Sequence, residues 1–443
     1  MKRFILSLLL IFSMLEATSQ SPGLKSADDF IDTNYPSLDK LYKQLHQNPE
    51  LSLHEEKTSE IIASELKSLG FEVIRKLGAY SHADIYKNGK GPTVLIRTDM
   101  DALPVEEKTG LPYASKAVGI NAIGNEVSVM HACGHDLHMT VFVGTARALI
   151  KAKDHWKGTL VMVAQSAEEV GLGADLMFKA GLYDKIPKPD YAIALHANPY
   201  LEAGKLGYRE GAFLASVDMM DLTVFGEGGH GAAPHTTKDP IVLSAQMILD
   251  FQTIVSREIN PLEPAVVTVG SIHGGTVHNI IPDEVTMQLT LRSYSEDVRN
   301  QIIASIHRIS KNVALAAGLS NDKIPVIKIR DPYTPATIND AALTNRIVGV
   351  FSKKFGNDNV IEMPPYMVGE DFSRFGVQSH KVPIFMFWLG AMDPAKVKSA
   401  KEKGEQLPSL HSPYFAPLPE PAIKTGVKAM LVAAFELFNH QKP

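Results

Sequence analysis

The sequence predicts an α/β fold in which a larger domain, built on a mixed, mostly parallel sheet covered by helices, carries an inserted ferredoxin-like α+β domain. Short, continuous apolar runs alternate with helix-like segments, a pattern typical of strands that are buried on both faces. A middle segment, residues 217–329, shows instead the order strand-helix-strand-strand-helix-strand. The chain has 443 residues, more than one compact core usually holds, so two domains are expected.

The elements of the larger domain follow from hydrophobic periodicity. Apolar side chains recur at helical spacing from Leu38 to Leu45 and again over residues 59–69, and a further helix is expected over residues 136–152. Buried strands are expected at residues 93–98, 159–165, 191–195 and 382–389. Strands that alternate with helices in this way favour parallel pairing, because each crossover helix packs back onto the sheet.

The inserted domain differs from its surroundings in the order of its elements. Strand and helix patterns of the larger domain resume after it, so we place it at residues 213–329, between two parts of the larger domain at residues 20–212 and 330–443. Its strands are expected at residues 219–225, 266–272, 284–293 and 326–329, and its helices at residues 241–254 and 296–317.

Residues 1–19 predict a secretory signal peptide. Lys2 and Arg3 form a basic start, residues 4–15 are apolar apart from two serines, and the small residues Ala17 and Ser19 precede the expected cut. An uncleaved membrane anchor is the alternative, but the apolar run is shorter than the roughly 20 residues that a spanning helix needs. We therefore expect an exported protein, periplasmic or secreted, with no stable membrane span.

Charge and cysteine content narrow the function further. The formal net charge of −5 and the lack of a basic run argue against nucleic acid as a partner. Cys133 is the single cysteine, so an internal disulfide is excluded. A lone thiol in an oxidising compartment is a liability unless it is buried or bound to a metal.

Polar side chains gather where the predicted buried strands end. In an open α/β sheet, ligands bind outside the carboxyl ends of the strands. Thiolate, imidazole and carboxylate are the groups that a borderline-soft divalent cation prefers. Each residue alone has an ordinary structural explanation, but three such positions at successive strand ends favour a metal site. The residues concerned are Asp99 and Asp101 after the first run, Glu168 and Glu169 after the second, His196 after the third, and Cys133 and His135 at the start of the intervening helix.

Nine ordered motifs span nearly the whole mature chain. They lie at residues 46–51, 55–58, 98–104, 130–138, 165–173, 229–235, 279–283, 369–372 and 410–413. With these motifs the sequence resembles the metallopeptidase-type N-acyl-amino-acid amidohydrolases, a family that includes bacterial aminoacylases, hippurate hydrolases and plant auxin-conjugate hydrolases. So many matches in the same order make the resemblance highly specific.

The resemblance implies a metal-dependent amidohydrolase that cuts the amide bond of N-acyl amino acids or similar small conjugates. It implies two divalent metal ions, zinc or else manganese or cobalt. Glu168 falls at the position of the general base, which takes a proton from a metal-activated water and passes it to the departing amine. The metal ligands that it implies are Cys133 as a bridging thiolate, His135, Glu169, His196 and His411.

The adjacent carboxylates are expected to divide their roles. Neighbouring residues of an extended chain face opposite ways, so Glu169 is free to bind metal while Glu168 points elsewhere. Asp99, Asp101 and Asp136 are expected to act as outer partners that orient the ligands.

The inserted domain is implied to complete the site as a lid or dimerisation domain. Residues 226–231 match G-x-G-x-x-G, but Pro234 and Pro240 delay the next helix, so we reject a dinucleotide site. The family has a histidine at His230 that stabilises the oxyanion, in many relatives donated by the partner subunit, which implies a homodimer. Asn279 and Arg292 match positions that hold the substrate's carboxylate; a surface salt bridge is the alternative for the arginine.

Three other functions are alternatives for this sequence. The first is a two-metal exopeptidase or dipeptidase of the same superfamily, which the thiolate motif at residues 130–136 disfavours. The second is a thiol enzyme with Cys133 as nucleophile and His135 as base. The third is a noncatalytic binding protein, which the retention of Glu168 and all five candidate ligands disfavours.

Overall fold

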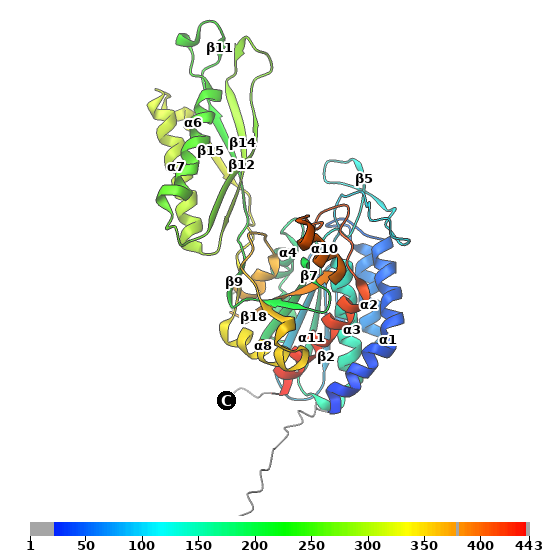
Figure 1. Cartoon of the computed structure of the whole chain (residues 1–443). Helices are drawn as coiled ribbons and strands as arrows, with labels where there is room; N and C mark the ends of the chain where they lie inside the picture. The colour runs from blue at the N-terminus through cyan, green and yellow to red at the C-terminus, as the bar shows by residue number, and fades with distance from the viewer. Residues whose placement is uncertain (1–21, 378–380, 440–443) are drawn as a thin grey trace, which may run out of the picture.

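The computed structural model describes residues 22–377 and 381–439 and arranges them as a larger body and an inserted unit (Figure 1). The larger body is built on an eight-stranded sheet and the inserted unit on a four-stranded sheet. The predicted signal peptide, residues 1–19, lies outside the described residues. Within the described ranges, none of the helices combines the length and the apolar character needed to cross a bilayer.

The sheet of the larger body is mixed and mostly parallel, as predicted. Its four central strands, β6, β3, β7 and β18, lie side by side and run parallel. They hold the four continuous apolar runs and are almost wholly buried, since helices cover both faces. In sheet order the strands are β1 (Glu72–Ile74), β2 (His82–Lys87), β6 (Thr159–Gln165), β3 (Thr93–Asp99), β7 (Tyr191–Glu202), β18 (Ile384–Met392), β8 (Leu206–Tyr208) and β17 (Val360–Glu362).

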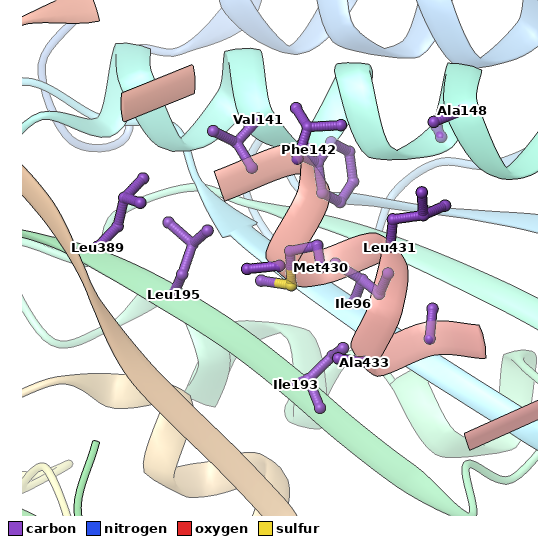
Figure 2. Close-up of a cluster of buried hydrophobic side chains, with 14 of the residues drawn as sticks. Ile96, Val141, Phe142, Ala148, Ile193, Leu195, Leu389, Met430, Leu431 and Ala433 are labelled. Atoms are coloured by element: carbon purple, nitrogen blue, oxygen red, sulfur yellow. The ribbon is translucent and has the colours of Figure 1, made fainter. Parts of the chain in front are cut away.

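Two hydrophobic clusters cover opposite faces of this sheet, because alternate residues of a strand point to opposite sides. Ile96 and Ile193 belong to one cluster, and their chain neighbours Leu95 and Ala192 belong to the other. Figure 2 shows Met430 and other side chains of α11 packed against Ile96 and Ile193. The helices on the first face are α1 (Pro22–Gln47), α2 (Glu56–Ser68), α3 (His135–Lys151), α8 (Ala341–Phe355) and α11 (Pro419–Asn439); those on the second are α4 (Gly173–Lys179), α5 (Leu182–Lys185) and α9 (Arg374–Val377).

The inserted unit has the ferredoxin-like order predicted for it. Its sheet runs β12-β14-β10-β15 with antiparallel pairing throughout, and two helices cover one face. Leu222 and Met287 from the sheet pack with Phe251 and Ile306 from the helices. The elements are β10 (Asp218–Phe225), α6 (Pro240–Thr253), β12 (Ala265–His273), β14 (Glu284–Ser293), α7 (Glu296–Ala316) and β15 (Val326–Ile329).

The inserted unit joins the larger body through a short strand pair. β9 (Gly211–Leu214) pairs with β16 (Thr337–Asn339) where the chain leaves and re-enters the larger body. The predicted start of the inserted domain, at residue 213, therefore falls within this linking pair. At the far end of the unit, β11 (Gly229–His230) pairs with β13 (Ile280–Ile281) (Figure 1).

Candidate metal centre

The carboxyl ends of three neighbouring parallel strands bring the predicted ligands to one edge of the sheet. Asp99 ends β3, Glu168 and Glu169 lie just beyond β6, and His196 lies in β7. The chain reaches the same edge again at α3, whose first residue is His135. These five positions come together because parallel strands end on the same side of a sheet.

The five predicted metal ligands form two groups that share the thiol of Cys133. The Cys133, His135 and His196 donor atoms lie within 4.8 Å of one another, and so do those of Cys133, Glu169 and His411. The Cys133 sulfur lies 3.5 Å from His196 Nε2, and His411 Nε2 lies 3.3 Å from Glu169 Oε2. One sulfur common to both groups is the arrangement that a thiolate bridging two cations would require.

A tight turn, rather than extended chain, separates Glu168 from Glu169. The expectation that an extended backbone divides their roles is wrong, because both residues lie in a turn closed by Gly171, whose N–H donates to the Glu168 carbonyl at 2.7 Å. Ala167, just before the turn, has a φ of +56° and donates its N–H to the buried Glu55 carboxylate at 2.7 Å. The turn directs both carboxylates at His135, at 4.0 Å from Glu168 and 3.8 Å from Glu169.

Hydrogen bonds fix which nitrogen of each histidine faces the centre. His135 Nδ1 lies 2.7 Å from the Asp101 carbonyl and therefore donates to it, and His196 Nδ1 donates to the Ala197 carbonyl at 2.9 Å. With Nδ1 protonated, Nε2 of each ring keeps its lone pair for a cation. The backbone carbonyl of Asp101 positions His135 in the way that an outer partner would. Asp99 instead accepts a 2.7 Å hydrogen bond from Nδ1 of His138, which is not one of the predicted ligands.

Asp136 has a different partner from the one its predicted role requires. Its carboxylate lies 2.7 Å from Nδ1 of His46 in α1. His46 Nε2 lies 3.1 Å from the Glu107 carboxylate. Burial lowers the pKa of His46, but the hydrogen bonds to Asp136 and Glu107 outweigh it and raise the pKa to about 10. The three residues form a buried charged network that anchors α1 to the start of α3.

A second acidic cluster, for which the sequence pattern predicts no role, lies beside Glu168. Glu168, Glu370 and Asp371 have carboxylate oxygens within 4.8 Å of one another. Arg97 is buried in β3, and its Nη2 lies 2.9 Å from the Glu370 carboxylate and 3.0 Å from the Asp371 carboxylate. The motif at residues 369–372 could have pointed to these carboxylates, but nothing in the neighbouring sequence indicates that this segment folds back beside Arg97. Burial and the charges of Glu370 and Glu169 raise the pKa of Glu168 well above its usual range.

The residues fit a pair of bound cations. His135 Nε2, Glu169 Oε1 and Asp101 Oδ1 are buried and have no hydrogen-bond partner among the described residues. Burial raises the pKa of Glu169 to about 7 and that of Cys133 well above its usual range, with nearby carboxylates adding to both. Thiolate, imidazole and carboxylate oxygen are the ligands of zinc and similar ions, and two positive ions would offset this buried acidic charge.

The candidate residues of the inserted unit are divided between its two ends. His230 is exposed at the tip, where its Nδ1 accepts the Ala232 N–H at 3.0 Å, and the Asn279 carbonyl accepts the Gly231 N–H at 2.9 Å. Figure 1 shows this tip, labelled β11, at the end of the unit farthest from the larger body. Within one chain the structure therefore does not bring His230 or Asn279 to the candidate ligands.

Arg292 lies at the opposite end of β14, at the junction with the larger body. One of its terminal nitrogens is 3.4 Å from the position that a Cβ on Gly369 would occupy, next to Glu370. Its half-buried guanidinium forms no hydrogen bond or ion pair with the described residues, so the surface-salt-bridge alternative has no partner there. Arg292 is thus an available cation near the acidic cluster, whereas Asn279 is not near it in the same chain.

Comparisons with known proteins agree with this geometry. The family model described as peptidase family M20/M25/M40 matches residues 95–435. The chain is 39% identical over 336 residues to an N-acetyl-L-cysteine deacetylase of Bacillus subtilis, covering 75% of this chain and 76% of that protein. It is 35% identical to thermostable carboxypeptidase 2 of Saccharolobus solfataricus, covering 90% and 95%. A solved dinuclear metal-binding peptidase of the M20 family, the YXEP protein of Bacillus subtilis, matches with a TM-score of 0.71 and 27% identity, over 91% of this chain and 98% of that one.

Proposed function

Because this chain belongs to peptidase family M20/M25/M40, we propose that it hydrolyses the amide bond of N-acyl amino acids or similar small conjugates. The predicted family resemblance is confirmed, and the chain is a metal-dependent hydrolase of amide bonds. The main structural support for this substrate class is the Cys133 thiol, which both ligand groups share, with the Glu168 carboxylate beside them. The deacetylase relative supports it, since an N-acetyl amino acid is such a conjugate.

The centre holds two divalent cations in this proposal, with zinc, manganese or cobalt as candidates. His135 and His196 would hold one, Glu169 and His411 the other, and Cys133 both. When bound, such ions polarise an amide carbonyl and lower the pKa of water towards neutrality. The dinuclear M20 structure supports the number of ions.

Glu168 acts as the general base and then the general acid. Its carboxylate faces both His135 and Glu370, so it lies at the rim of the ligand groups without belonging to the two that share Cys133. There it accepts a proton from the attacking water and returns that proton to the departing amine nitrogen. Arg97 opposes the nearby charge of Glu370 and Asp371 and so holds this acidic cluster together.

Arg292 binds the carboxylate of the amino-acid half of the substrate. Its free guanidinium at the junction between the two bodies suits paired hydrogen bonds to a carboxylate. His230 and Asn279 are supplied by the second subunit of a homodimer, because their own tip lies away from their own centre. The inserted unit offers a surface for that subunit: β12 is an edge strand, and α6 exposes Ile241, Val242 and Leu249.

The chain is exported in this proposal, with residues 1–19 removed as a signal peptide. N-terminal sequencing of the protein from its native cell fraction tests this. A mature chain that begins near residue 20 is expected, whereas an intact N-terminus in the cytoplasmic fraction would contradict the proposal.

A substrate panel and a metal assay test the activity itself. We expect hydrolysis of N-acetyl and N-benzoyl amino acids, loss of that hydrolysis after exhaustive chelation, and recovery when zinc, manganese or cobalt is returned. The carboxypeptidase relative favours an exopeptidase as second candidate, so dipeptides belong in the same panel. Cleavage of dipeptides alone would select the exopeptidase, and full activity after chelation would exclude the metal mechanism.

A further inference from the structure

Glu55 is a fully buried glutamate beside the turn that carries Glu168, and it has no role in the mechanism above. It opens one of the nine sequence motifs, residues 55–58, and directly precedes α2. A glutamate is rarely buried unless a specific partner compensates for the loss of water around its carboxylate. Its contacts should therefore explain why this residue type stands at this position.

Capping of the helix does not explain Glu55. The residue occupies the N-cap position of α2, but its side chain forms no hydrogen bond to the backbone of that helix. Shorter polar side chains such as serine and aspartate are usual at this position, because they reach the free N–H groups of the first turn. Glu50 binds these groups instead, since its carboxylate accepts the Thr58 N–H and the Thr58 hydroxyl, each at 2.8 Å.

The partner of Glu55 is the backbone of the turn that carries the proposed base. Its Oε1 accepts a hydrogen bond of 2.7 Å from the N–H of Ala167, the residue directly before Glu168. Ala167 is itself fully buried, so its N–H is removed from bulk water and requires an acceptor from the protein. Glu55 thus satisfies a backbone donor one residue away from the base.

Ala167 has a backbone conformation that alanine does not adopt freely. Its φ of +56° lies in the left-handed region, where the Cβ of an L-residue is crowded by the backbone. Its carbonyl accepts the N–H groups of Leu172 and Gly173 at 3.2 and 3.0 Å, which closes the turn around Glu168. Hydrogen bonds on both sides of Ala167 therefore hold this conformation, and the one on its N–H side comes from outside the turn.

A different carboxylate holds Glu169. The Glu169 N–H donates to Asp101 Oδ2 at 2.9 Å, just beyond the end of β3. Asp101 therefore fixes the position of Glu169, while Glu55 acts on the side of the turn where Ala167 leads into Glu168. Loss of the Glu55 acceptor should for this reason displace the proposed base more than the neighbouring metal ligand.

The segment that carries Glu55 is held firmly on both sides. Before it, the Ala102 N–H donates to the Glu50 carbonyl at 2.8 Å, which ties this segment to the end of β3. After it, the buried α2 side chains Ile62 and Leu66 pack into the first hydrophobic cluster. A functional group keeps its geometry when the residues that support it are themselves fixed by packing and hydrogen bonds.

We propose that Glu55 is a positioning residue, whose carboxylate oxygen holds the Ala167 N–H and so keeps Glu168 in the geometry that proton transfer requires. The inference rests on the proposed amidohydrolase function, in which Glu168 is the base, and it assigns the motif at residues 55–58 a role in that function. The turn requires an acceptor oxygen at this point and not a negative charge. Glutamine, which keeps the oxygen, should therefore replace Glu55, whereas leucine should not.

Kinetics of the metal-loaded enzyme, with the N-acyl amino acid that the wild type cleaves best, test the proposal. Glu55→Leu keeps most of the buried volume and removes the acceptor, so kcat should fall about 10- to 100-fold, with KM and metal content close to wild type. Glu55→Gln should lower kcat less than about 2-fold. Glu50→Leu is the matched control: its carboxylate bonds α2 and not the turn, so it should lower the melting temperature and leave kcat unchanged.

Hydrogen exchange of the turn gives a readout that does not depend on activity. In the peptide that covers residues 166–173, one amide should exchange at least about 10-fold faster in Glu55→Leu than in wild type, because Ala167 has lost its acceptor. Glu55→Gln and Glu50→Leu should keep the wild-type exchange of this peptide. If Glu55→Leu does not fold, Glu55→Asp takes its place with the same expectations, since its shorter side chain withdraws the carboxylate from Ala167.

Three results would overturn the inference while N-acyl hydrolysis persists. The first is a wild-type kcat in Glu55→Leu, and the second is a Glu55→Gln enzyme as slow as Glu55→Leu, which would assign the effect to charge. The third is a loss of metal in proportion to kcat, which would make Glu55 a support of the ligands and not of the base. If the wild type cleaves no N-acyl amino acid, the proposed function fails, and hydrogen exchange alone decides whether Glu55 holds the turn.

Discussion

The edge of the eight-stranded sheet and the tip of the four-stranded sheet carry histidines that the family resemblance assigns to one site, but their surroundings are opposite. At the edge, His135 is wholly buried, with Asp99 and Asp101 close to its ring nitrogens. At the tip, His230 is exposed, and a backbone N–H of its own loop is its hydrogen-bond partner among the described residues.

This difference separates two kinds of functional residue. The edge is organised by its own fold, so a substitution there alters charge balance and stability as well as chemistry. The tip is an exposed surface whose role depends on the molecule that binds it. A substitution there should therefore alter the catalytic rate and leave the fold intact. Four predictions test this contrast.

The largest effect is expected from Glu168→Gln, which removes the proposed base while keeping its shape. The catalytic rate should fall about 10²- to 10⁴-fold, since proton transfer by a positioned group contributes about that much. Metal content measured by mass spectrometry should stay at two ions per chain. Glu169→Gln is the matched control one residue along, and it should lose metal as well as activity. A nearly normal rate for Glu168→Gln would contradict the assignment.

The next effect is that of His230→Ala, which tests the tip. The rate should fall about 10²- to 10³-fold with no loss of metal and no change in melting temperature, because the side chain is exposed. His235→Ala, at an exposed position of the same loop, should behave as wild type.

Mixing the His230→Ala and Glu168→Gln subunits shows whether the tip acts across subunits. If each site takes its histidine from the partner, mixed dimers have one intact site, and re-equilibrated mixtures should recover about a quarter of wild-type activity. No recovery in dimers that demonstrably exchange would place His230 in its own subunit's site or outside catalysis.

A smaller effect, on stability, is expected from His46→Ala in the buried network behind α3. Removing one partner leaves Asp136 and Glu107 facing each other without a cation, which should cost about 3 kcal/mol in the free energy of unfolding. Lys43→Ala, in a half-exposed pair with Asp39 on the same helix, should cost less than about 0.5 kcal/mol.

The cost of His46→Ala should depend on pH. Because the folded-state pKa of His46 is raised to about 10 from an ordinary value of 6.5, its contribution is complete below pH 6.5 and is lost as the pH rises through 10. Urea unfolding of both proteins at several pH values measures this. A difference that grows with rising pH would refute the network.

The smallest effect is expected from Arg330→Ala in the inserted unit. Arg330 and Asp221 form an exposed ion pair with a 3.3 Å separation, and such pairs contribute little because water screens them. The free energy of unfolding should change by less than about 0.5 kcal/mol, and Asp221→Ala should give the same result. A change above about 1 kcal/mol in the free energy of unfolding would show that Arg330 makes a stabilising interaction beyond this exposed ion pair.

Much of the fold was predictable because burial on both faces leaves a local pattern. The strands β3, β6, β7 and β18 each contain a continuous apolar stretch and are buried at nearly every position, as strands covered on both sides are. The inserted unit was predictable for the complementary reason, since β14 alternates buried and exposed residues.

The candidate ligands were predictable because residue type limits what can bind a cation, and because strand ends are visible in the sequence. The residues that surround these ligands were less predictable from the sequence. The expected role of Asp136 was displaced by His46, which lies 90 positions earlier, and Arg97 meets Asp371 across 274 positions. Nothing local marks such pairs, since packing of distant elements decides them.

The sequence by itself determined the fold class, the family and the chemical types that gather at the sheet edge, since hydrophobic period and donor chemistry are properties of the residues themselves. Only the tertiary structure decided that Cys133 is common to both ligand groups, that Glu168 lies between His135 and Glu370, and that His230 lies at a tip away from its own centre. The physical reason is that these are distances between elements, and such distances exist only once the helices and strands have packed.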